Sequence, residues 1–184
     1  MSESTMSRRD RLRRVVILCR NFAANLAYYR VGRRAEHLPL QDYTHNAKAS
    51  FWRIVSANFI DTCVLEWCKL FADPNGKHHW SKIVSAPDDY KTLMMMDLGL
   101  DDAAFQEEIA AMKHYRDKFL AHLDSEEIMK IPILDTAKKA VWFYHSYIVR
   151  REAQSDDLVG LPLELEPGYA LCEKEAQEIY RRNT

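Results

Sequence analysis

The chain has 184 residues, of which 47% are hydrophobic and 29% charged, a composition typical of a folded domain and not of a disordered segment. Only five glycines are present, which disfavours a many-stranded β architecture with its many tight turns. The longest early apolar run, residues 15–19, is too short for a transmembrane helix or for the apolar region of a secretory signal. The four cysteines form no CxxC pair and indicate reduced thiols. We therefore expect a soluble, cytoplasmic, single-domain protein with no membrane association.

The net charge of −1 is distributed unevenly along the chain. Residues 1–36 hold nine arginines and three acidic residues, a net charge of +6, so the other 148 residues carry −7. Such asymmetry indicates contact with nucleic acid or with an acidic partner. A second interpretation stays open, in which these arginines lie on a solvated helix face and pair with acidic neighbours from elsewhere in the fold.

Apolar residues spaced by threes and fours predict a succession of helices, and the six prolines fall between these periodic segments. The expected long helices cover residues 8–36, 46–72, 101–124 and 133–154, with a short helix around 88–96 and a short last helix over about 169–182. The Asp73-Pro74-Asn75-Gly76 stretch predicts a helix stop and a turn. The sequence therefore predicts an all-α fold, a bundle of four main helices plus short extra helices. Residues 1–154 are expected to form the bundle, and 155–184 a linker and short C-terminal helix packed on or beside the same domain.

The helix expected over 101–124 carries the residues of greatest chemical interest. Arg116 falls on its apolar stripe, where a guanidinium is costly unless it is paired or faces a polar cavity. His122 follows six residues later, about 120° around the helix and roughly 9 Å along it. The cation of Arg116, the carboxylate of Asp117 and the imidazole of His122, which titrates near neutrality, thus lie in one short stretch beside aromatic residues.

The string RDKFLAH at residues 116–122 resembles the signature of the HEPN superfamily (higher eukaryote and prokaryote nucleotide-binding domains). That signature is an Arg, then a polar Asn, Asp or His, and a His after four to six intervening residues. With WCKLF at 67–71, Trp80 and HYRDKFLAHLD at 114–124, the pattern is most similar to the abortive-infection-type branch of bacterial phage-defence proteins. The resemblance spans roughly residues 47–150.

The resemblance implies a HEPN-like helical bundle that forms a homodimer, in which two Arg/His sets face a shared cleft. It further implies a metal-independent endoribonuclease that cleaves RNA by 2′-hydroxyl attack. Such an enzyme would act as a phage-defence effector or as the toxin of a toxin–antitoxin system, with an antitoxin protein as a further partner. The alternative is a non-catalytic module of the same fold that binds a nucleotide, an RNA or a protein.

The residue types suit this chemistry without a metal or another cofactor. His122 is expected to move protons as general base or acid, and Arg116 to grip non-bridging phosphate oxygens. Asp117 is expected to orient Arg116 or an imidazole of the partner chain. Substrate contacts are expected from five further residues, two beside the motif and three on the arginine-rich first helix: Tyr115, Lys118, Arg13, Arg14 and Arg20.

Structural interpretations of the same residues remain open. Arg116 with Asp117 or Asp124 could form a buried ion pair, and His122 could be a satisfied interface histidine. His145 is interpreted as a core histidine, although a position facing His122 is also conceivable. His78 and His79 are expected in a solvated loop, because Cys63 and Cys68 lack the spacing of a zinc site with them.

Overall fold

The computed structural model describes residues 6–42, 44, 48–121 and 130–183, and these residues form helices and connecting turns with no strand. The predicted all-α fold is confirmed. Its α-helices are α1 (Arg8–Gly32), α2 (Ala49–Trp67), α3 (Pro87–Leu98), α4 (Asp102–Tyr115), α5 (Asp135–Tyr147) and α6 (Glu166–Arg181). The wider π-helical segments Cys68–Ala72, Arg116–Ala121 and Ile148–Glu152 extend α2, α4 and α5, and short 3₁₀ segments cover Ala35–Gln41 and Trp80–Lys82.

Local sequence signals explain where the helices begin and end. The Ser7 side chain accepts the backbone N–H of Asp10 at the start of α1, and Asp101 accepts that of Ala104 at the start of α4. Helix α3 has Pro87 in its first turn and ends at Gly99, whose φ of 66° is the left-handed conformation that glycine adopts without strain. The predicted stop after residue 72 is also present, closed by a hydrogen bond from Gly76 N to Asp73 O.

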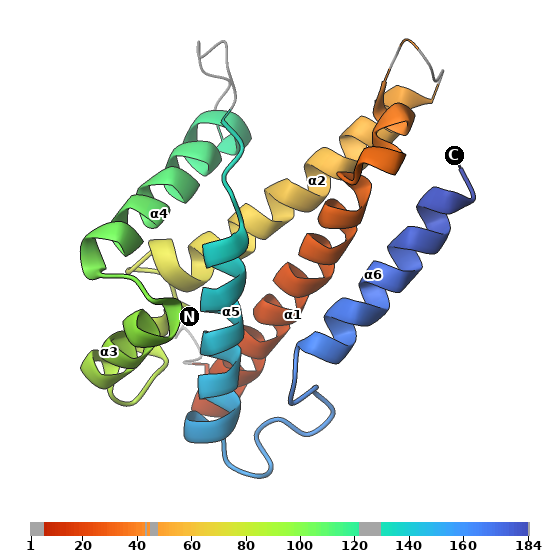
Figure 1. Ribbon diagram of the computed structural model, residues 1–184. Helices are drawn as coiled ribbons and strands as arrows, with labels where there is room; N and C mark the ends of the chain where they lie inside the picture. Colours follow the sequence, from red (N-terminus) through yellow and green to blue (C-terminus); the bar gives the residue numbers. More distant parts are fainter. Residues whose placement is uncertain (1–5, 43, 45–47, 122–129, 184) are drawn as a thin grey trace, which may run out of the picture.

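Helix α1 lies at the centre of the molecule (Figure 1). It packs against α2, α5 and α6, and its buried residues from Leu12 to Ala27 follow the three- and four-residue spacing of one broad stripe. Helices α1, α2 and α6 run together as one arm, while α3 and α4 form the other side, with α5 between them (Figure 1). A broad apolar stripe is expected on a helix that supports several others.

Aromatic side chains link the helices in the main core. Trp67 and Phe71 have ring centroids 5.1 Å apart, and Phe71 in turn meets Tyr144 of α5 at 5.7 Å. Tyr90 of α3 contacts Tyr144 at 5.5 Å. The WCKLF string of residues 67–71 thus supplies core residues, since all of its side chains except Lys69 are buried.

Helix α6 contributes to both clusters of buried residues. Tyr169, near its start, belongs to the main core. Tyr180, near its end, stacks on His37 and packs against Trp52 in a second, smaller cluster, with centroid distances of 5.0 and 4.9 Å. The C-terminal helix therefore packs along α1, and near its end it also meets Trp52 of α2.

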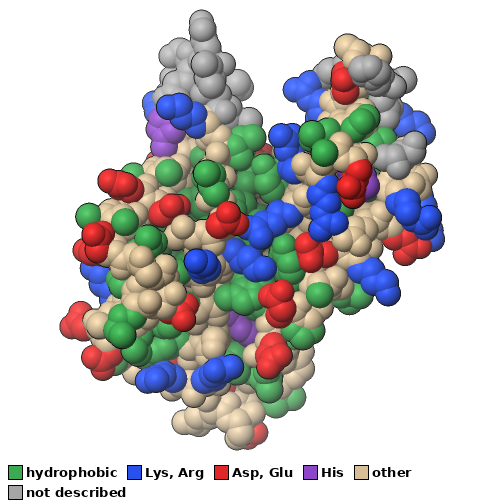
Figure 2. Space-filling view, in the orientation of Figure 1, with side chains coloured by type: hydrophobic (Ala, Val, Ile, Leu, Met, Phe, Trp, Pro, Cys, Tyr) green, Lys and Arg blue, Asp and Glu red, His purple; other side chains and the backbone are tan. Residues whose placement is uncertain are grey.

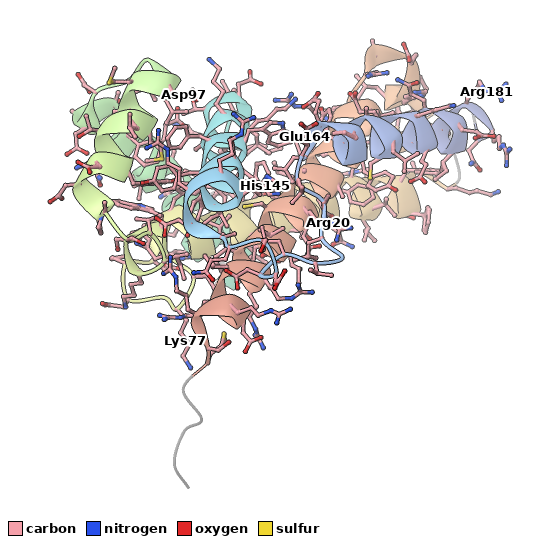
Figure 3. The ribbon with its side chains drawn as sticks, turned by 90° about the horizontal axis from the view of Figure 1, so that it is seen from below. Arg20, Lys77, Asp97, His145, Glu164 and Arg181 are labelled. Atoms are coloured by element: carbon pink, nitrogen blue, oxygen red, sulfur yellow. The ribbon has the colours of Figure 1, made fainter. Side chains whose placement is uncertain are left out.

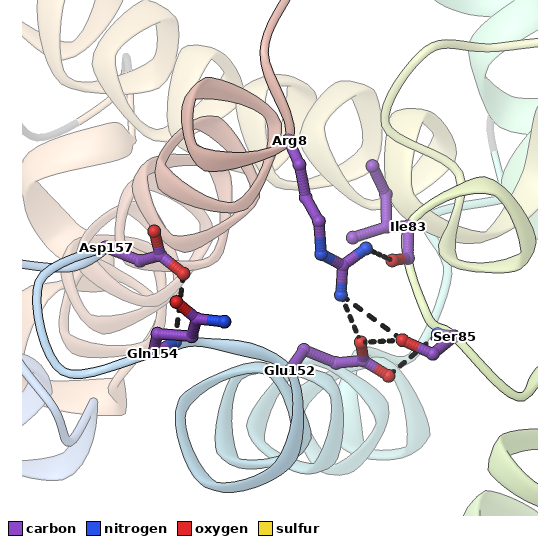
Figure 4. Close-up of polar contacts among 6 residues, drawn as sticks. All are labelled: Arg8, Ile83, Ser85, Glu152, Gln154 and Asp157. Atoms are coloured by element: carbon purple, nitrogen blue, oxygen red, sulfur yellow. Dashed lines mark hydrogen bonds and ion pairs between the residues drawn. The ribbon is translucent and has the colours of Figure 1, made fainter.

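Three segments that are far apart in the sequence meet at the start of α1 (Figure 4). Arg8 forms an ion pair with the buried carboxylate of Glu152 and donates to the carbonyl of Ile83. Ser85 donates its backbone N–H and its hydroxyl to the same carboxylate, at 2.8 and 2.6 Å. This network ties α1, the segment before α3 and the end of α5 together.

The apolar spacing of residues 46–72 predicts a buried face that includes Phe51 and Ile54, and this prediction is wrong for the first half of the helix. Phe51 and Ile54 each expose 60% of their surface, whereas Trp52 and Ile60 are buried. The reason is that apolar residues surround this part of α2, so spacing alone does not select the face that meets α1. In the described part of the chain, no helix combines the length and the apolar character needed to cross a membrane.

Candidate functional site

Arg116 stands where α4 ends and its π-helical extension begins, and two carboxylates hold its guanidinium. Its Nη1 donates to both carboxylate oxygens of Asp73, at 2.7 and 2.8 Å, and its Nε donates to Asp117 Oδ1 at 2.8 Å. The side chain retains 20% of its exposure. Arg116 is thus a paired arginine at the edge of the core, which is one of the interpretations that the sequence left open.

These contacts fix both the charge and the orientation of Arg116. The hydrogen bond with Asp117 and the contacts with Asp73 raise the pKa of Arg116 despite its partial burial, so the group stays cationic. Nη2 forms no hydrogen bond with a described residue. The Nη2 group of Arg116 is therefore left for a further contact, because Nε and Nη1 already donate to carboxylates.

The buried stripe of α4 passes through Tyr115 and not through Arg116, which differs from the sequence-based expectation. Phe105, Met112 and Tyr115 are at most 2% exposed. The Tyr115 hydroxyl donates to Asp61 Oδ1 of α2 at 2.8 Å. Burial, together with this hydrogen bond, raises the pKa of Tyr115. The tyrosine is therefore a buried contact between α4 and α2, and Arg116 lies at the margin of that contact.

The other residues of the motif are only partly described. Lys118 is half-buried and the Asp117 side chain is half-exposed, both on the π-helical segment. His122 and Asp124 lie outside the described residues, so their relation to Arg116 stays a prediction. Asp73 is the partner that sequence reasoning missed, because the Asp-Pro-Asn-Gly string indicated a turn and gave no signal of a contact 43 residues away.

The arginines of α1 and of the residues just after it divide into paired and exposed groups. Arg13 donates to the backbone carbonyls of Asp157 and Val159, at 3.1 and 2.9 Å, and so holds the segment that precedes α6. Arg14 and Arg20 are exposed. Arg30 pairs with Asp135 and Arg34 with Glu173, so part of the charge asymmetry is internal pairing. Side chains of Lys and Arg also gather in the middle of one face, between α5 and α6 (Figure 2).

Two histidines considered at the sequence level are buried. His145 is 2% exposed, and its label stands near the middle of the molecule in Figure 3. Burial lowers the pKa of His145 to about 4. The interpretation of His145 as a core histidine is confirmed.

The expectation of a solvated loop is wrong for His79, which is 6% exposed. Its Nε2 lies 3.1 Å from the carbonyl oxygen of Phe71 and its Nδ1 lies 2.8 Å from the Ser81 hydroxyl. Because a carbonyl only accepts, Nε2 carries the proton and Nδ1 accepts from Ser81. The hydrogen bond from His79 satisfies the carbonyl of Phe71, one of the carbonyls that the end of a helix leaves without a partner. It thereby holds the loop that contains His79 against the end of the α2 extension.

Among the residues that the structure describes, no group of three or more His, Cys, Asp or Glu side chains could hold a metal ion. Comparison with known proteins gave no match to a family model, a curated protein or a solved structure.

Proposed function

We propose that this protein is a HEPN-like, metal-independent endoribonuclease built on a four-helix bundle, which acts as a phage-defence effector or as the toxin of a toxin–antitoxin pair. The observation that carries the proposal is the RDKFLAH string, together with the position of its arginine. Arg116 is a permanently charged guanidinium, oriented by two carboxylates, with one nitrogen that forms no hydrogen bond to a described residue. Such a group suits the stabilisation of charge on a phosphate.

The proposed reaction begins with attack of a ribose 2′-hydroxyl on the adjacent phosphorus. His122 removes the proton of that hydroxyl or protonates the departing 5′-oxygen, and Arg116 stabilises the negative charge on the non-bridging oxygens. The products are a 2′,3′-cyclic phosphate and a 5′-hydroxyl. Because the nucleophile is the 2′-hydroxyl, DNA is not a substrate. In a homodimer with a shared cleft, the partner chain would supply a second Arg/His set.

The ion pairs of Arg116 also favour the second candidate, a non-catalytic module that binds a nucleotide, an RNA or a protein. Asp73 and Asp117 already occupy two of the three guanidinium nitrogens, and their charges oppose the approach of a phosphate. In this alternative, the ion pair of Arg116 with Asp73 joins the end of α4 to the turn after the α2 extension. The RDKFLAH motif then forms part of a binding surface and not of an active site.

An RNA-cleavage assay with the purified full chain separates the two candidates. Wild type, Arg116→Ala, His122→Ala and the control Arg9→Ala, which removes an exposed arginine of the same helix as Arg13, are prepared in parallel. Each is incubated in EDTA with tRNA and with a 2′-deoxy oligonucleotide. The proposal expects RNA cleavage by wild type and Arg9→Ala alone, with cyclic phosphate ends.

Three outcomes contradict the nuclease proposal. Cleavage of the 2′-deoxy strand excludes 2′-hydroxyl attack, and loss of activity in EDTA excludes a metal-independent reaction. Equal cleavage by all four proteins assigns the activity to a contaminant. If none of the folded proteins cleaves RNA, a gel-shift measurement with the same tRNA tests the binding module directly.

A further inference from the structure

A groove with a volume of about 500 Å³, the α3–α5 groove, lies between α3 and the second half of α5 with its π-helical extension. The two helices pack directly on each other. In Figure 3 the label of Asp97, one of the lining residues, stands between their ribbons. All described lining residues belong to these elements, so the groove shares no residue with the site around Arg116. Its volume lies in the usual range for small-molecule sites.

Aromatic rings form a fixed floor in the α3–α5 groove. Phe143 and Tyr147 line the groove one helical turn apart on α5. Both rings pack on Tyr90 of α3, with centroid distances of 5.4 and 4.9 Å. Tyr90 is fully buried, and Tyr147 is 8% exposed. The floor therefore exists before a ligand arrives, which is how most small-molecule sites are built.

The wall on the α3 side is apolar and open to solvent. Met96 exposes 74% of its surface there, and Leu93, one turn earlier, is half-buried. Met94 is fully buried, so the methionines of this helix serve both the core and the groove. The unbranched thioether of methionine adapts to apolar groups of different shape. Together with the aromatic floor, this wall suits the ring or hydrocarbon part of a ligand.

The charged groups of the groove are two arginines and one aspartate, a net charge of +1. Arg150 and Arg151 line it from the α5 extension, and Asp97 lines it from α3. All three are exposed, and none of them forms an ion pair with another described residue. The guanidinium carbon of Arg151 lies 5.6 Å from the ring centroid of Tyr147, so a cation stands beside the aromatic floor. This arrangement suits an anion that is attached to an apolar body.

The charge balance favours a carboxylate over a phosphate monoester. A carboxylate carries one negative charge, and its two oxygens match the planar fork of a guanidinium. A phosphate monoester carries nearly two negative charges at pH 7, so the carboxylate of Asp97 opposes it more strongly. Ser146 of α5 adds a hydroxyl donor to the same lining.

We infer that the α3–α5 groove binds a small monocarboxylic acid with an apolar or aromatic body. The carboxylate lies at Arg150 and Arg151, and the body packs on Phe143, Tyr147 and Met96. The inference does not depend on the proposed nuclease activity, because the groove contains no residue of the RDKFLAH motif or of its ion pairs. The ligand class also differs from the nucleotide, RNA or protein of the second candidate function.

Calorimetric titration of the full chain at pH 7 and low salt tests the inference, with phenylacetate as the probe. Three related compounds each change one property: phenylacetamide lacks the charge, acetate lacks the ring, and benzyl phosphate replaces the carboxylate by a phosphate. We expect phenylacetate to bind at least tenfold more tightly than the amide or acetate, equivalent to about 1.4 kcal/mol. It should also bind more tightly than benzyl phosphate, because Asp97 opposes the second charge.

Variants of exposed residues assign the binding to the groove, and because these residues are exposed the variants are expected to fold. Arg150→Gln combined with Arg151→Gln should weaken phenylacetate binding by about tenfold or more. Met96→Gln should weaken it by about threefold, because the apolar wall is lost. Asp97→Asn should reduce the preference for phenylacetate over benzyl phosphate. The control Arg182→Gln removes an exposed arginine just after α6 and should leave the affinity unchanged.

Several results would overturn the inference. The first is the absence of phenylacetate binding to wild type at millimolar concentration. The second is equal affinity in wild type and in the double arginine variant, which would place the binding elsewhere. Equal affinity for phenylacetate and phenylacetamide would remove the role of the arginines, and tighter binding of benzyl phosphate would contradict the selection of a single charge.

Discussion

The hydroxyl of Tyr180 in α6 occupies the space that a Cβ atom on residue 32 of α1 would need. Gly32 is the last residue of α1, and the absence of its side chain lets the two helices approach closely. Tyr180 cannot easily turn away, because its ring lies against those of His37 and Trp52. This glycine therefore permits the close packing of the end of the C-terminal helix on α1.

Gly32→Ala should destabilise the fold by about 1 to 2 kcal/mol, because overpacking outweighs the better helix propensity of alanine. Chemical denaturation followed by circular dichroism measures this change. The matched control is Gly168→Ala in the first turn of α6, where a Cβ meets nothing within 4 Å, and it should be neutral or slightly stabilising. Tyr180→Phe in the Gly32→Ala background should recover part of the loss, since the buried hydroxyl has no hydrogen-bond partner among the described residues. A neutral Gly32→Ala would show that α6 shifts freely.

Glu152→Gln should lower the free energy of unfolding by about 2 kcal/mol at pH 7, because the carboxylate receives charge-assisted hydrogen bonds from Arg8 and Ser85. Burial by itself would raise the pKa of Glu152, but the bonds from Ser85 and Arg8 outweigh it and hold the pKa below its usual 4.5. The stabilisation is therefore present above pH 4.5 and is lost as the pH falls through the lower folded-state value. Urea titrations of both proteins from pH 7 to pH 3 should converge at the acid end; a constant difference would contradict this origin.

His145 should make the protein less stable as the pH falls from 6.5 to about 4. Burial, the main cause, lowers the pKa of His145 from 6.5 to about 4, so in this window the unfolded chain binds a proton that the folded chain does not. The free energy of unfolding therefore decreases, by about 3 kcal/mol in total. In His145→Gln this slope should be reduced, as measured by thermal unfolding across the window. Because His78 and His79 also have lowered pKa values and are unchanged in both proteins, their effect cancels in the comparison. Identical slopes would contradict the buried, neutral state of His145.

Arg116 and Asp73 should be energetically coupled by about 1 kcal/mol, a moderate value because both side chains retain solvent contact. The measurement is a double-mutant cycle of unfolding free energies with Arg116→Gln, Asp73→Asn and the double variant. Asp73→Asn also separates the two candidate functions. If Arg116 binds phosphate, removal of the opposing charge should preserve or increase RNA affinity, whereas a purely structural pair predicts loss of stability without a gain in affinity.

The sequence predicts the helices well because their signals are local. The apolar spacing that predicts a helix from residue 8 and the stop at Asp73-Pro74 both depend on neighbours in the chain, and the structure confirms both. The face of α2 was predicted less well, because Phe51 and Ile54 belong to a segment that is apolar on several sides. Only the position of α1 decides which of those sides is buried.

The candidate site likewise has features that the sequence predicts and features that only the tertiary structure decides. The sequence by itself determined an all-α protein and placed Arg116 beside Asp117 on the helix expected over 101–124. It also required that the guanidinium be paired or face a polar cavity, because burying it alone is too costly. Only the tertiary structure decided that Asp73 is its partner, that Glu152 closes on Arg8, and that Asp97 and Arg151 share one groove. The physical reason is range: propensity and capping act over a few residues, whereas ion pairs and pockets depend on how helices distant in the chain pack together.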